Sequence, residues 1–199
     1  MAARMPGGRP LVGAHVRLDV ATADDAEGIF AALDHDEVWA AGFNGGPAAR
    51  PTSADGWADR IEAAVAEQRA MYTVRLQGGG RIVGTTSLGD SDLVHQRTHI
   101  GWTAYAPDVW STEVNPECKL LLMTHAFEDC GFGRVKIQTD LINTRSQAAI
   151  AKLGATREGV LRRHMLRGDG SRRDTVVFSV IVDEWPAVKA GLQSRLVGG

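Results

Sequence analysis

Residues 100–155 constrain the fold most, because strand and helix signals alternate there with clear boundaries. A strand pattern ends before Pro107, and a long segment with an apolar stripe follows it. A second strand pattern at residues 134–140 precedes a helix pattern over residues 144–153, which Gly154 ends. This alternation predicts a fold in which helices and strands share one core.

The first helix of this stretch has a well-marked start. Asn115, Pro116 and Glu117 supply an N-cap side chain, a proline at the first helical position and a carboxylate in the first turn. We therefore expect a helix that begins here and runs to about Asp129. Its expected buried side chains are those of Leu121, Leu122 and Phe127.

The rest of the chain continues the alternation without an internal repeat. A helix with Trp57, Ile61 and Val65 on one stripe is expected over residues 53–69, and three consecutive glycines from Gly78 form a hairpin turn. The further expected helices cover residues 22–33 and 184–195, and the further expected strands cover residues 15–20, 72–76, 81–88, 95–104, 156–167 and 172–182. The segment over residues 39–51 is expected to be a loop.

Composition and charge narrow the class of protein. The 199 residues are 44% hydrophobic and carry a formal charge of -2, so we expect one globular domain over residues 11–196 with flexible ends at 1–10 and 197–199. There is no basic surplus for nucleic acid, and no apolar run long enough for a membrane or a signal peptide. The sequence thus predicts a cytoplasmic protein with neither nucleic acid nor a membrane as a partner.

Cysteines and histidines do not indicate a disulfide or a metal site. Cys118 and Cys130 fall in one expected helix, where a rise of about 1.5 Å per residue separates them by roughly 18 Å, too far for a disulfide. His95 and His99 share a strand face but lack a third ligand. We expect buried thiols, hydrogen-bonded or surface histidines, and no metal.

The combination of motifs resembles the GNAT acetyltransferase superfamily, and within it the ribosomal-protein-alanine N-acetyltransferases (RimJ/RimL-like). The likeness covers about residues 12–196 and is carried by IGWT, by WSTEVNPECKLLLMTHAFE and by Asn143, Arg145 and Ser146 followed by KLGA. The resemblance implies an α+β fold with α/β/α layers. Its mixed, mostly antiparallel sheet would have about seven strands, splayed between the fourth and fifth strands, with helices on both faces.

The resemblance also implies acetyl-CoA as cosubstrate. Backbone N–H groups of the splayed strand would hold the thioester and pantetheine, and a helix N-terminus would attract the diphosphate. The cofactor-binding residues that we expect are Ile100, Gly101, Trp102, Thr103, Trp110, Ser111, Thr112, Glu113, Val114, Asn115, Asn143 and Ser146. A capped helix start without a ligand is the alternative for the turn before Pro116.

One departure from the family pattern concerns the glycine-rich turn, which reads Ser111, Thr112 and Glu113 in this chain. A carboxylate about 4 Å from a phosphate charge would cost on the order of 4 kcal/mol at an effective dielectric of ~20, against ~1 kcal/mol from the helix dipole. We therefore expect Glu113 to point into solvent, or the protein to bind CoA weakly.

Three residues are candidates for the chemistry. Asn143 would contact pantetheine or an ordered water, and Ser146 would donate a proton to the departing thiolate; capping and first-turn hydrogen bonding are their structural alternatives. Relatives have a glutamate base where this chain has Met165, so His164 is the candidate base, with an exposed strand histidine as the alternative. Glu158, Asp174 and a water relay are the further options for the base.

The acceptor site is expected in the loop that contains Trp39, Phe43 and Asn44, whose rings would either line a pocket or anchor the loop. No acidic cluster favours a polyamine, so a peptide N-terminus or a small neutral amine is expected. A homodimer is left open. The alternative function is a non-catalytic acyl-CoA-binding or regulatory protein, since the glycine turn and the glutamate base are both replaced.

Overall fold

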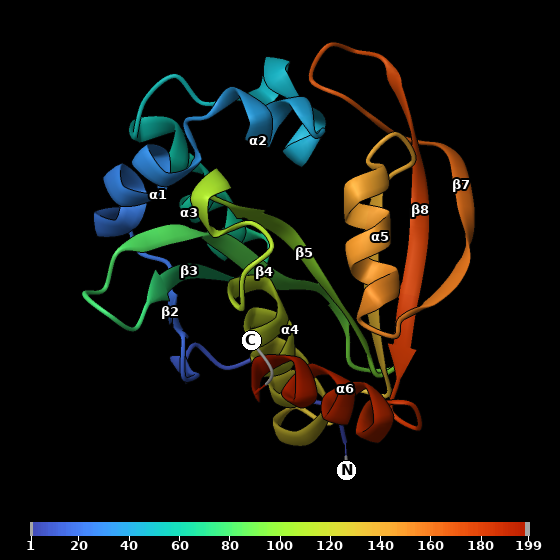
Figure 1. Cartoon of the computed structure of the whole chain (residues 1–199). Coiled ribbons are helices and arrows are strands. Elements are labelled where there is room, and N and C mark those ends of the chain that lie inside the picture. The colour runs from blue at the N-terminus through green and yellow to red at the C-terminus, as the bar shows by residue number, and fades with distance from the viewer. Residues whose placement is uncertain (1, 198–199) are drawn as a thin grey trace.

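The structure is a computed structural model that describes residues 2–197. One sheet of eight strands in the order β1-β2-β3-β4-β5-β6-β8-β7 forms its centre (Figure 1). The strands are β1 (Leu11–Val12), β2 (Val16–Val20), β3 (Ala70–Leu76), β4 (Ile82–Asp92), β5 (Arg97–Tyr105), β6 (Arg134–Asp140), β7 (Thr156–Leu166) and β8 (Arg172–Ile181). The helices are α1 (Ala26–Leu33), α2 (Asp36–Ala40), α3 (Asp55–Ala66), α4 (Val114–Thr124), α5 (Thr144–Lys152) and α6 (Trp185–Val197).

The sheet is mixed and mostly antiparallel, as expected. Only the pair β5–β6 is parallel among the described strands. The sheet has one strand more than the sequence predicted, because Leu11 and Val12 pair with β2. Two residues are too few for an alternating pattern to reveal a strand.

Alternate side chains of β3 point to the two helical layers. Thr73 donates its hydroxyl to Asp25, just before α1, and α1 packs with α3 on this face. Tyr72 points to the other face, toward Cys130 after α4, and α6 packs against α4 there. The sheet therefore has helices on both faces, as the resemblance implied.

The strands β5 and β6 pair over only part of their length. Their parallel register joins Arg97 with Arg134 and ends at Ile100 with Ile137, after which β5 continues alone on that side. Figure 1 shows β5 diverging from the part of the molecule that carries α5, β7 and β8. This confirms the predicted splay.

Glu117 docks the start of the chain onto α4. Its carboxylate is buried and accepts hydrogen bonds from the backbone N–H groups of Ala14 (2.8 Å), His15 (2.7 Å) and Val16 (2.7 Å). A Cβ atom on Gly13 would overlap this carboxylate, so a glycine is required beside it. The carboxylate in the first helical turn thus satisfies donors of another segment.

The start and end of the α4 helix differ from the sequence prediction. The helix begins at Val114 with Glu113 before it, so Asn115 lies inside the first turn and is not the N-cap. The helix therefore begins two residues earlier than the sequence predicted, and its first residue, Val114, is buried. At its other end α4 stops at Thr124, and a π-helical turn, His125–Asp129, continues it.

Other differences are smaller. In α3 the buried stripe is Trp57, Ile61 and Ala64, whereas Val65 is 72% exposed, because at 3.6 residues per turn it lies about 80° around the helix from Trp57, at the edge of the stripe. The expected loop at residues 39–51 contains the end of α2 and two short 3₁₀ turns. His95 lies in the turn before β5 and does not share the strand with His99.

Residues near both ends of the described chain have defined positions. Residues 2–10 form no helix or strand, yet Arg4 donates its backbone N–H to Cys130 O at 2.9 Å and its Nε to Asp129 O at 2.9 Å. The expected flexible end at 197–199 lies outside the described residues except for Val197, the last residue of α6. No helix among residues 2–197 is long and apolar enough to cross a membrane.

Candidate functional site

The free part of β5 carries a β-bulge. Ser87 pairs with Gly101 and Thr85 pairs with Ala104, so β5 has one residue more than β4 between these pairs. Trp102 takes up the extra length with a φ of +50°, which is unusual for a bulky residue. Ile100 is buried, whereas Gly101, Trp102 and Thr103 are partly exposed.

Gly101 is required at this bulge. A Cβ atom there would lie 2.7 Å from both Cε1 and Nε2 of His99, and no side chain fits that space. The His99 ring packs against Trp102 with the centroids 4.9 Å apart and the ring planes tilted by 47°. The glycine therefore allows a buried histidine to sit directly beside the strand edge.

His99 belongs to a chain of polar groups that runs along β4, β5 and β6. Its Nδ1 lies 3.0 Å from Asp90 Oδ2, and Lys136 Nζ lies 3.2 Å from the same oxygen. Burial lowers the pKa of His99, and the hydrogen bond from His99 holds the pKa of Asp90 well below its usual range. These directions fit a neutral imidazole that donates Nδ1–H to an ionised Asp90. The Nε2 atom is buried and has no hydrogen-bond partner among the described residues.

The connection between β5 and α4 adopts a backbone conformation typical of glycine, although residues 111–113 include no glycine. Ser111 has a φ of +65°, in the left-handed region that glycine adopts at no cost. Thr112 donates its hydroxyl to Val109 O at 2.7 Å and fixes the turn. Glu113 is partly exposed and precedes the first residue of α4. The backbone can thus present the start of α4 even though side chains have replaced the glycines.

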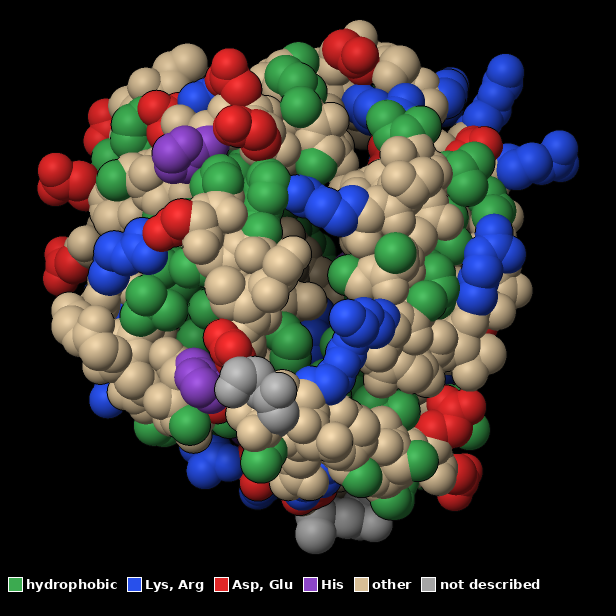
Figure 2. All heavy atoms as spheres, in the orientation of Figure 1, with side chains coloured by type: hydrophobic (Ala, Val, Ile, Leu, Met, Phe, Trp, Pro, Cys, Tyr) green, Lys and Arg blue, Asp and Glu red, His purple; other side chains and the backbone are tan. Residues whose placement is uncertain are grey.

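The start of α5 lies opposite this connection. Asn143 accepts the Ser146 N–H at 2.9 Å and donates Nδ2–H to Ala41 O at 2.6 Å, so its role as the N-cap of α5 is confirmed. The guanidinium carbon of Arg145 lies 3.7 Å from the centroid of the Trp110 ring. Arg145 therefore bridges the two sides of the splay at its edge. Figure 2 shows a hollow between these two sides, bordered by basic side chains.

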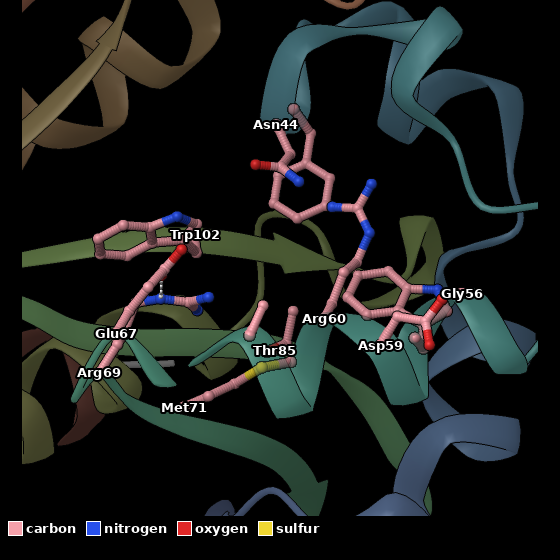
Figure 3. Close-up of a pocket in the computed structure, with 12 residues that line it drawn as sticks. Asn44, Gly56, Asp59, Arg60, Glu67, Arg69, Met71, Thr85 and Trp102 are labelled. Carbon is pink, nitrogen blue, oxygen red and sulfur yellow. Dashed lines mark hydrogen bonds and ion pairs between the residues drawn. The ribbon is translucent and has the colours of Figure 1, made fainter. Parts of the chain in front are cut away.

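A cavity of about 500 Å³ lies on the α3 side of β5. It is lined, among others, by Phe43, Asn44, Trp57, Arg60, Met71 and Trp102. In Figure 3, Trp102 and Arg69 lie at one end of the cavity, Gly56 and Asp59 at the other, and Asn44 and Arg60 between them. The structure thus brings two of the three predicted acceptor residues, Phe43 and Asn44, to the same cavity as the β5 bulge.

Trp39, the third predicted acceptor residue, lies behind this cavity. Its ring is 1% exposed and contacts Phe43 at 5.2 Å and Trp57 at 6.4 Å between centroids. Its Nε1–H donates to Leu33 O at 2.8 Å. Trp39 therefore supports two rings of the cavity wall from behind.

Two arginines of the cavity were not anticipated from the sequence. Arg69 stacks over Trp102, with the guanidinium carbon 4.5 Å from the ring centroid, and its Nε lies 3.1 Å from Glu67 Oε2. Arg60 lies over Trp57 at 5.4 Å, and burial lowers its pKa. Arg60 lies three residues after Trp57 in an expected helix, which could have suggested a cation–π contact but not the cavity, and no local pattern joins Arg69 to Trp102.

The candidate base His164 lies on the outermost strand, β7. It is exposed, and its Nδ1 lies 3.1 Å from Thr175 Oγ1. Of the weaker options, Glu158 pairs with Arg134, and Asp174 accepts the backbone N–H of Arg163 at 2.7 Å. Both carboxylates therefore have structural partners.

Lys119 is the main residue that sequence reasoning missed. It lies on α4, is 5% exposed, and its Nζ is 3.2 Å from Thr103 Oγ1 on the free part of β5. The available signal was a lysine among the apolar residues Cys118, Leu121 and Leu122. Burial lowers the pKa of Lys119 to about 8.

Comparison with known proteins identifies a family for this chain. The family described as "Acetyltransferase (GNAT) domain" matches residues 15–156. The "Putative ribosomal N-acetyltransferase YdaF" of Bacillus subtilis (strain 168) is 28% identical over 148 residues, which cover 71% of this chain and 78% of that one.

Solved structures support the same assignment. A putative acetyltransferase from T. thermophilus is 34% identical with a TM-score of 0.83, covering 94% of this chain and 97% of that one. A GCN5-related N-acetyltransferase from Brucella melitensis shares the fold, with 24% identity, a TM-score of 0.89, and coverage of 98% of this chain and 88% of that one. With a family match over most of its length, a splayed sheet and a bulged strand at the splay, this chain belongs to the GNAT acetyltransferase family.

Proposed function

We propose that this protein is an N-acetyltransferase that transfers the acetyl group of acetyl-CoA to a primary amine, by direct attack while both substrates are bound. The family supports acetyl transfer in general. The observation that carries the proposal is the position of Trp102, which lies at the bulge beside the splay and also lines the 500 Å³ cavity. An amine in the cavity and a thioester in the splay would therefore meet at one strand.

The residues around the splay suit acetyl-CoA. The start of α4 offers free backbone N–H groups and the positive end of the helix dipole to a diphosphate, and Ser111 gives the preceding turn its left-handed path. The edge of β5 beyond Ile100 leaves backbone groups free for the amides of pantetheine. Glu113 must point away from the phosphates for this binding mode.

We assign roles to the α5 start in the same proposal. Asn143, already held by Ala41 and the Ser146 N–H, would orient the pantetheine or a water. Ser146 would supply the proton that the departing sulfur takes. For removal of the amine proton, His164 and a water relay are the candidates.

The acceptor is proposed to be a peptide N-terminus or a small amine. The name of YdaF, a ribosomal N-acetyltransferase, favours a protein N-terminus. Within the cavity the exposed carboxylates of Asp59 and Glu67 are balanced by Arg60 and Arg69, so no acidic cluster selects a polycation. We propose a cytoplasmic location, as the sequence predicted.

The proposal is tested by following free thiol release from acetyl-CoA in the presence of single amines. The panel should contain peptides beginning with alanine or serine, the same peptides with a blocked N-terminus, and small primary amines. We expect release with at least one free amine and none with its blocked form, together with an acetylated product by mass spectrometry. Binding of acetyl-CoA without turnover on any acceptor would contradict the proposal.

That last result would instead support the alternative, a non-catalytic acyl-CoA-binding or regulatory protein. The observation that favours this alternative is the replacement of the family's glycines by Ser111, Thr112 and Glu113. Calorimetry with CoA on wild type and Glu113→Gly measures whether the Glu113 side chain weakens cofactor binding. If the affinity is unchanged, Glu113 does not obstruct the cofactor.

A further inference from the structure

The side chain of Lys119 is a buried cation without a carboxylate partner. It leaves α4 toward the sheet and is 5% exposed, and its one hydrogen bond among residues 2–197 is to Thr103 Oγ1 at 3.2 Å. Neighbouring Glu117 is engaged by three backbone N–H groups of the 14–16 segment. No carboxylate of the described residues lies within ion-pairing distance of the ammonium.

The ammonium lies at the splay. Thr103 follows Trp102 in the bulge, three residues beyond Ile100, where the pairing of β5 with β6 ends. The Thr103 hydroxyl is itself held by Thr86 Oγ1 at 2.7 Å, so the position of the lysine's one acceptor is fixed. Lys119 therefore brings a positive charge to the bulge from the α4 face, opposite the cavity.

This arrangement is costly unless something else binds to it. An ammonium has three N–H donors, and Thr103 accepts only one of them. A buried donor without an acceptor costs about 1–3 kcal/mol, and a buried charge without a partner costs more. Burial accordingly lowers the pKa of Lys119 to about 8. A ligand that placed an oxygen in the splay at Thr103 would supply the missing acceptor.

The position along α4 indicates which part of acyl-CoA that oxygen belongs to. The diphosphate is expected at the helix start, and Lys119 lies five residues after Val114, about 7.5 Å further along the axis. Its ammonium contacts the bulge of β5 and not the turn at Ser111 and Thr112. The reacting end of the cofactor is therefore a better match than its phosphates.

We propose that Lys119 is a catalytic residue whose ammonium donates a hydrogen bond to the carbonyl oxygen of the bound acyl thioester. This inference rests on the proposed acetyl transfer. As the amine nitrogen bonds to the carbonyl carbon, the carbonyl electron pair moves to the oxygen, where the positive charge stabilises it. The electron pair on oxygen then re-forms the C=O bond as the C–S bond breaks, and the sulfur leaves with the bonding pair. The sulfur takes a proton from water or from Ser146, which regains one from solvent, and the amine proton passes to the base or to solvent. Lys119 keeps its proton throughout.

The test uses wild type, Lys119→Met and Lys119→Gln, with Lys152→Met as the matched control, because Lys152 is an exposed lysine on α5. The infrared band of the carbonyl is recorded for bound acetyl-CoA labelled with ¹³C at that carbon. We expect the band of wild type and Lys152→Met to lie at lower wavenumber than in water, and that of both Lys119 variants to move to higher wavenumber. A band that does not depend on Lys119 would overturn the inference.

Affinity provides a second readout that needs no acceptor amine. By calorimetry, acetyl-CoA and S-acetylpantetheine should both bind about tenfold more weakly to Lys119→Met, which removes a buried charge and should unfold at or above the wild-type temperature. Weaker binding of acetyl-CoA with unchanged binding of S-acetylpantetheine would place Lys119 at the phosphates and overturn the assignment. Lys119→Gln supplies the same comparison if Lys119→Met does not fold.

Failure of this inference and failure of the proposed function give different results. If wild type transfers acetyl groups and both Lys119 variants match its kcat and its carbonyl band, the function stands and the role of Lys119 is wrong. If no amine is acetylated but the carbonyl band depends on Lys119, the contact stands and the proposed function is wrong. If both stand, kcat of Lys119→Met falls by about 100-fold, the usual order for losing one donor to a developing oxyanion.

Discussion

At the scale of single residues, the buried charge of Lys119 makes the free energy of unfolding depend on pH. Its pKa is about 8 in the folded protein and near 10.5 when unperturbed, because burial disfavours the charged form. The unfolded chain thus binds this proton more tightly, so the charge destabilises the fold at pH below 8. The cost disappears as the pH rises from 8 to about 10.5, where both states lose the proton, and its full size is on the order of 3 kcal/mol.

We predict that Lys119→Met raises the free energy of unfolding by up to about 3 kcal/mol at pH 7, and that this gain shrinks steadily between pH 8 and 10.5. Burial raises the pKa of Cys118 to about 12 and also raises the pKa of Tyr105, and both groups therefore destabilise wild type and variant at high pH, although the Lys119 charge also lowers the pKa of Cys118. Only the difference between variant and wild type is therefore informative. Urea unfolding at pH 7, 8.5 and 10 measures it, and a gain that stays constant with pH would contradict the explanation.

At the scale of elements, the β7–β8 hairpin is tied to the acceptor loop through the end of β6. Arg167 donates Nε to Asp140 Oδ2 at 2.8 Å and Nη2 to Oδ1 at 3.0 Å, and Gly168 donates its N–H to Gly45 O at 2.9 Å. Burial by itself would raise the pKa of Asp140, but Arg167 and the Ile142 N–H outweigh it and lower the pKa. The pair therefore stabilises the fold at pH above the usual carboxyl range and loses its effect as the pH falls below it.

Replacing Asp140 with asparagine should detach the hairpin tip from the loop that lines the cavity. We expect a loss of about 2 kcal/mol in the free energy of unfolding at pH 7, because the buried bidentate pair is broken, and faster hydrogen exchange at the Gly168 amide. The control is Glu158→Gln, which breaks the more exposed pair with Arg134 and should cost less than about 1 kcal/mol. Equal losses for the two variants would show that burial of Asp140 is not what matters.

At the scale of the whole molecule, the chain start packs onto the turn after α4. Besides the bonds from Arg4, an ion pair joins Arg9 to Asp129, and Tyr72 Oη lies 3.5 Å from Gly7 O. These contacts connect residues 2–10 to the π-helical turn and to the sheet. The ion pair between Arg9 and Asp129 is open to solvent, so by itself it contributes little.

We predict that deleting residues 2–10 lowers the midpoint of thermal unfolding by about 3 °C, which corresponds to roughly 1 kcal/mol in a chain of this size. The double variant Arg4→Ala, Arg9→Ala should reproduce only part of this loss, because it removes the two side-chain contacts with Asp129 but keeps the backbone hydrogen bonds of Arg4 and Gly7. Calorimetry of the three proteins checks both statements. An unchanged midpoint after the deletion would favour the flexible end that the sequence predicted.

Local signals in the sequence were sufficient for most elements. The strand at Arg134–Asp140 and the helix start at Thr144 agree with the expectation, because Asn143 caps α5 and Gly154, with a φ of +91°, follows its end. Propensity, capping and glycine conformation act over a few residues, so they can be read from neighbours in the chain. The N-cap predicted at Asn115 was wrong: α4 already begins at Val114, a residue buried by tertiary contacts that its neighbours in the chain do not reveal.

The candidate site was predictable in part. The splayed strand and the resemblance led to Ile100 through Thr103, and the loop aromatics led to Phe43, which does line the cavity. The pairing of His99 with Asp90, the stacking of Arg145 on Trp110 and the contact of Lys119 with Thr103 were not predictable. Each joins residues from different elements or strands, and no local pattern records which pair will meet.

The sequence by itself determined the alternation of helices and strands, which follows from periodicity, and it determined the family through motifs that are contiguous in the chain; the splay was an implication of that resemblance. Only the tertiary structure decided which charges are buried and what they face. Lys119 illustrates the difference: its helix could be predicted, but the side chain became a buried cation at the bulge of β5 only when α4 packed under the sheet. The cost of a buried charge depends on its surroundings, and packing alone supplies them.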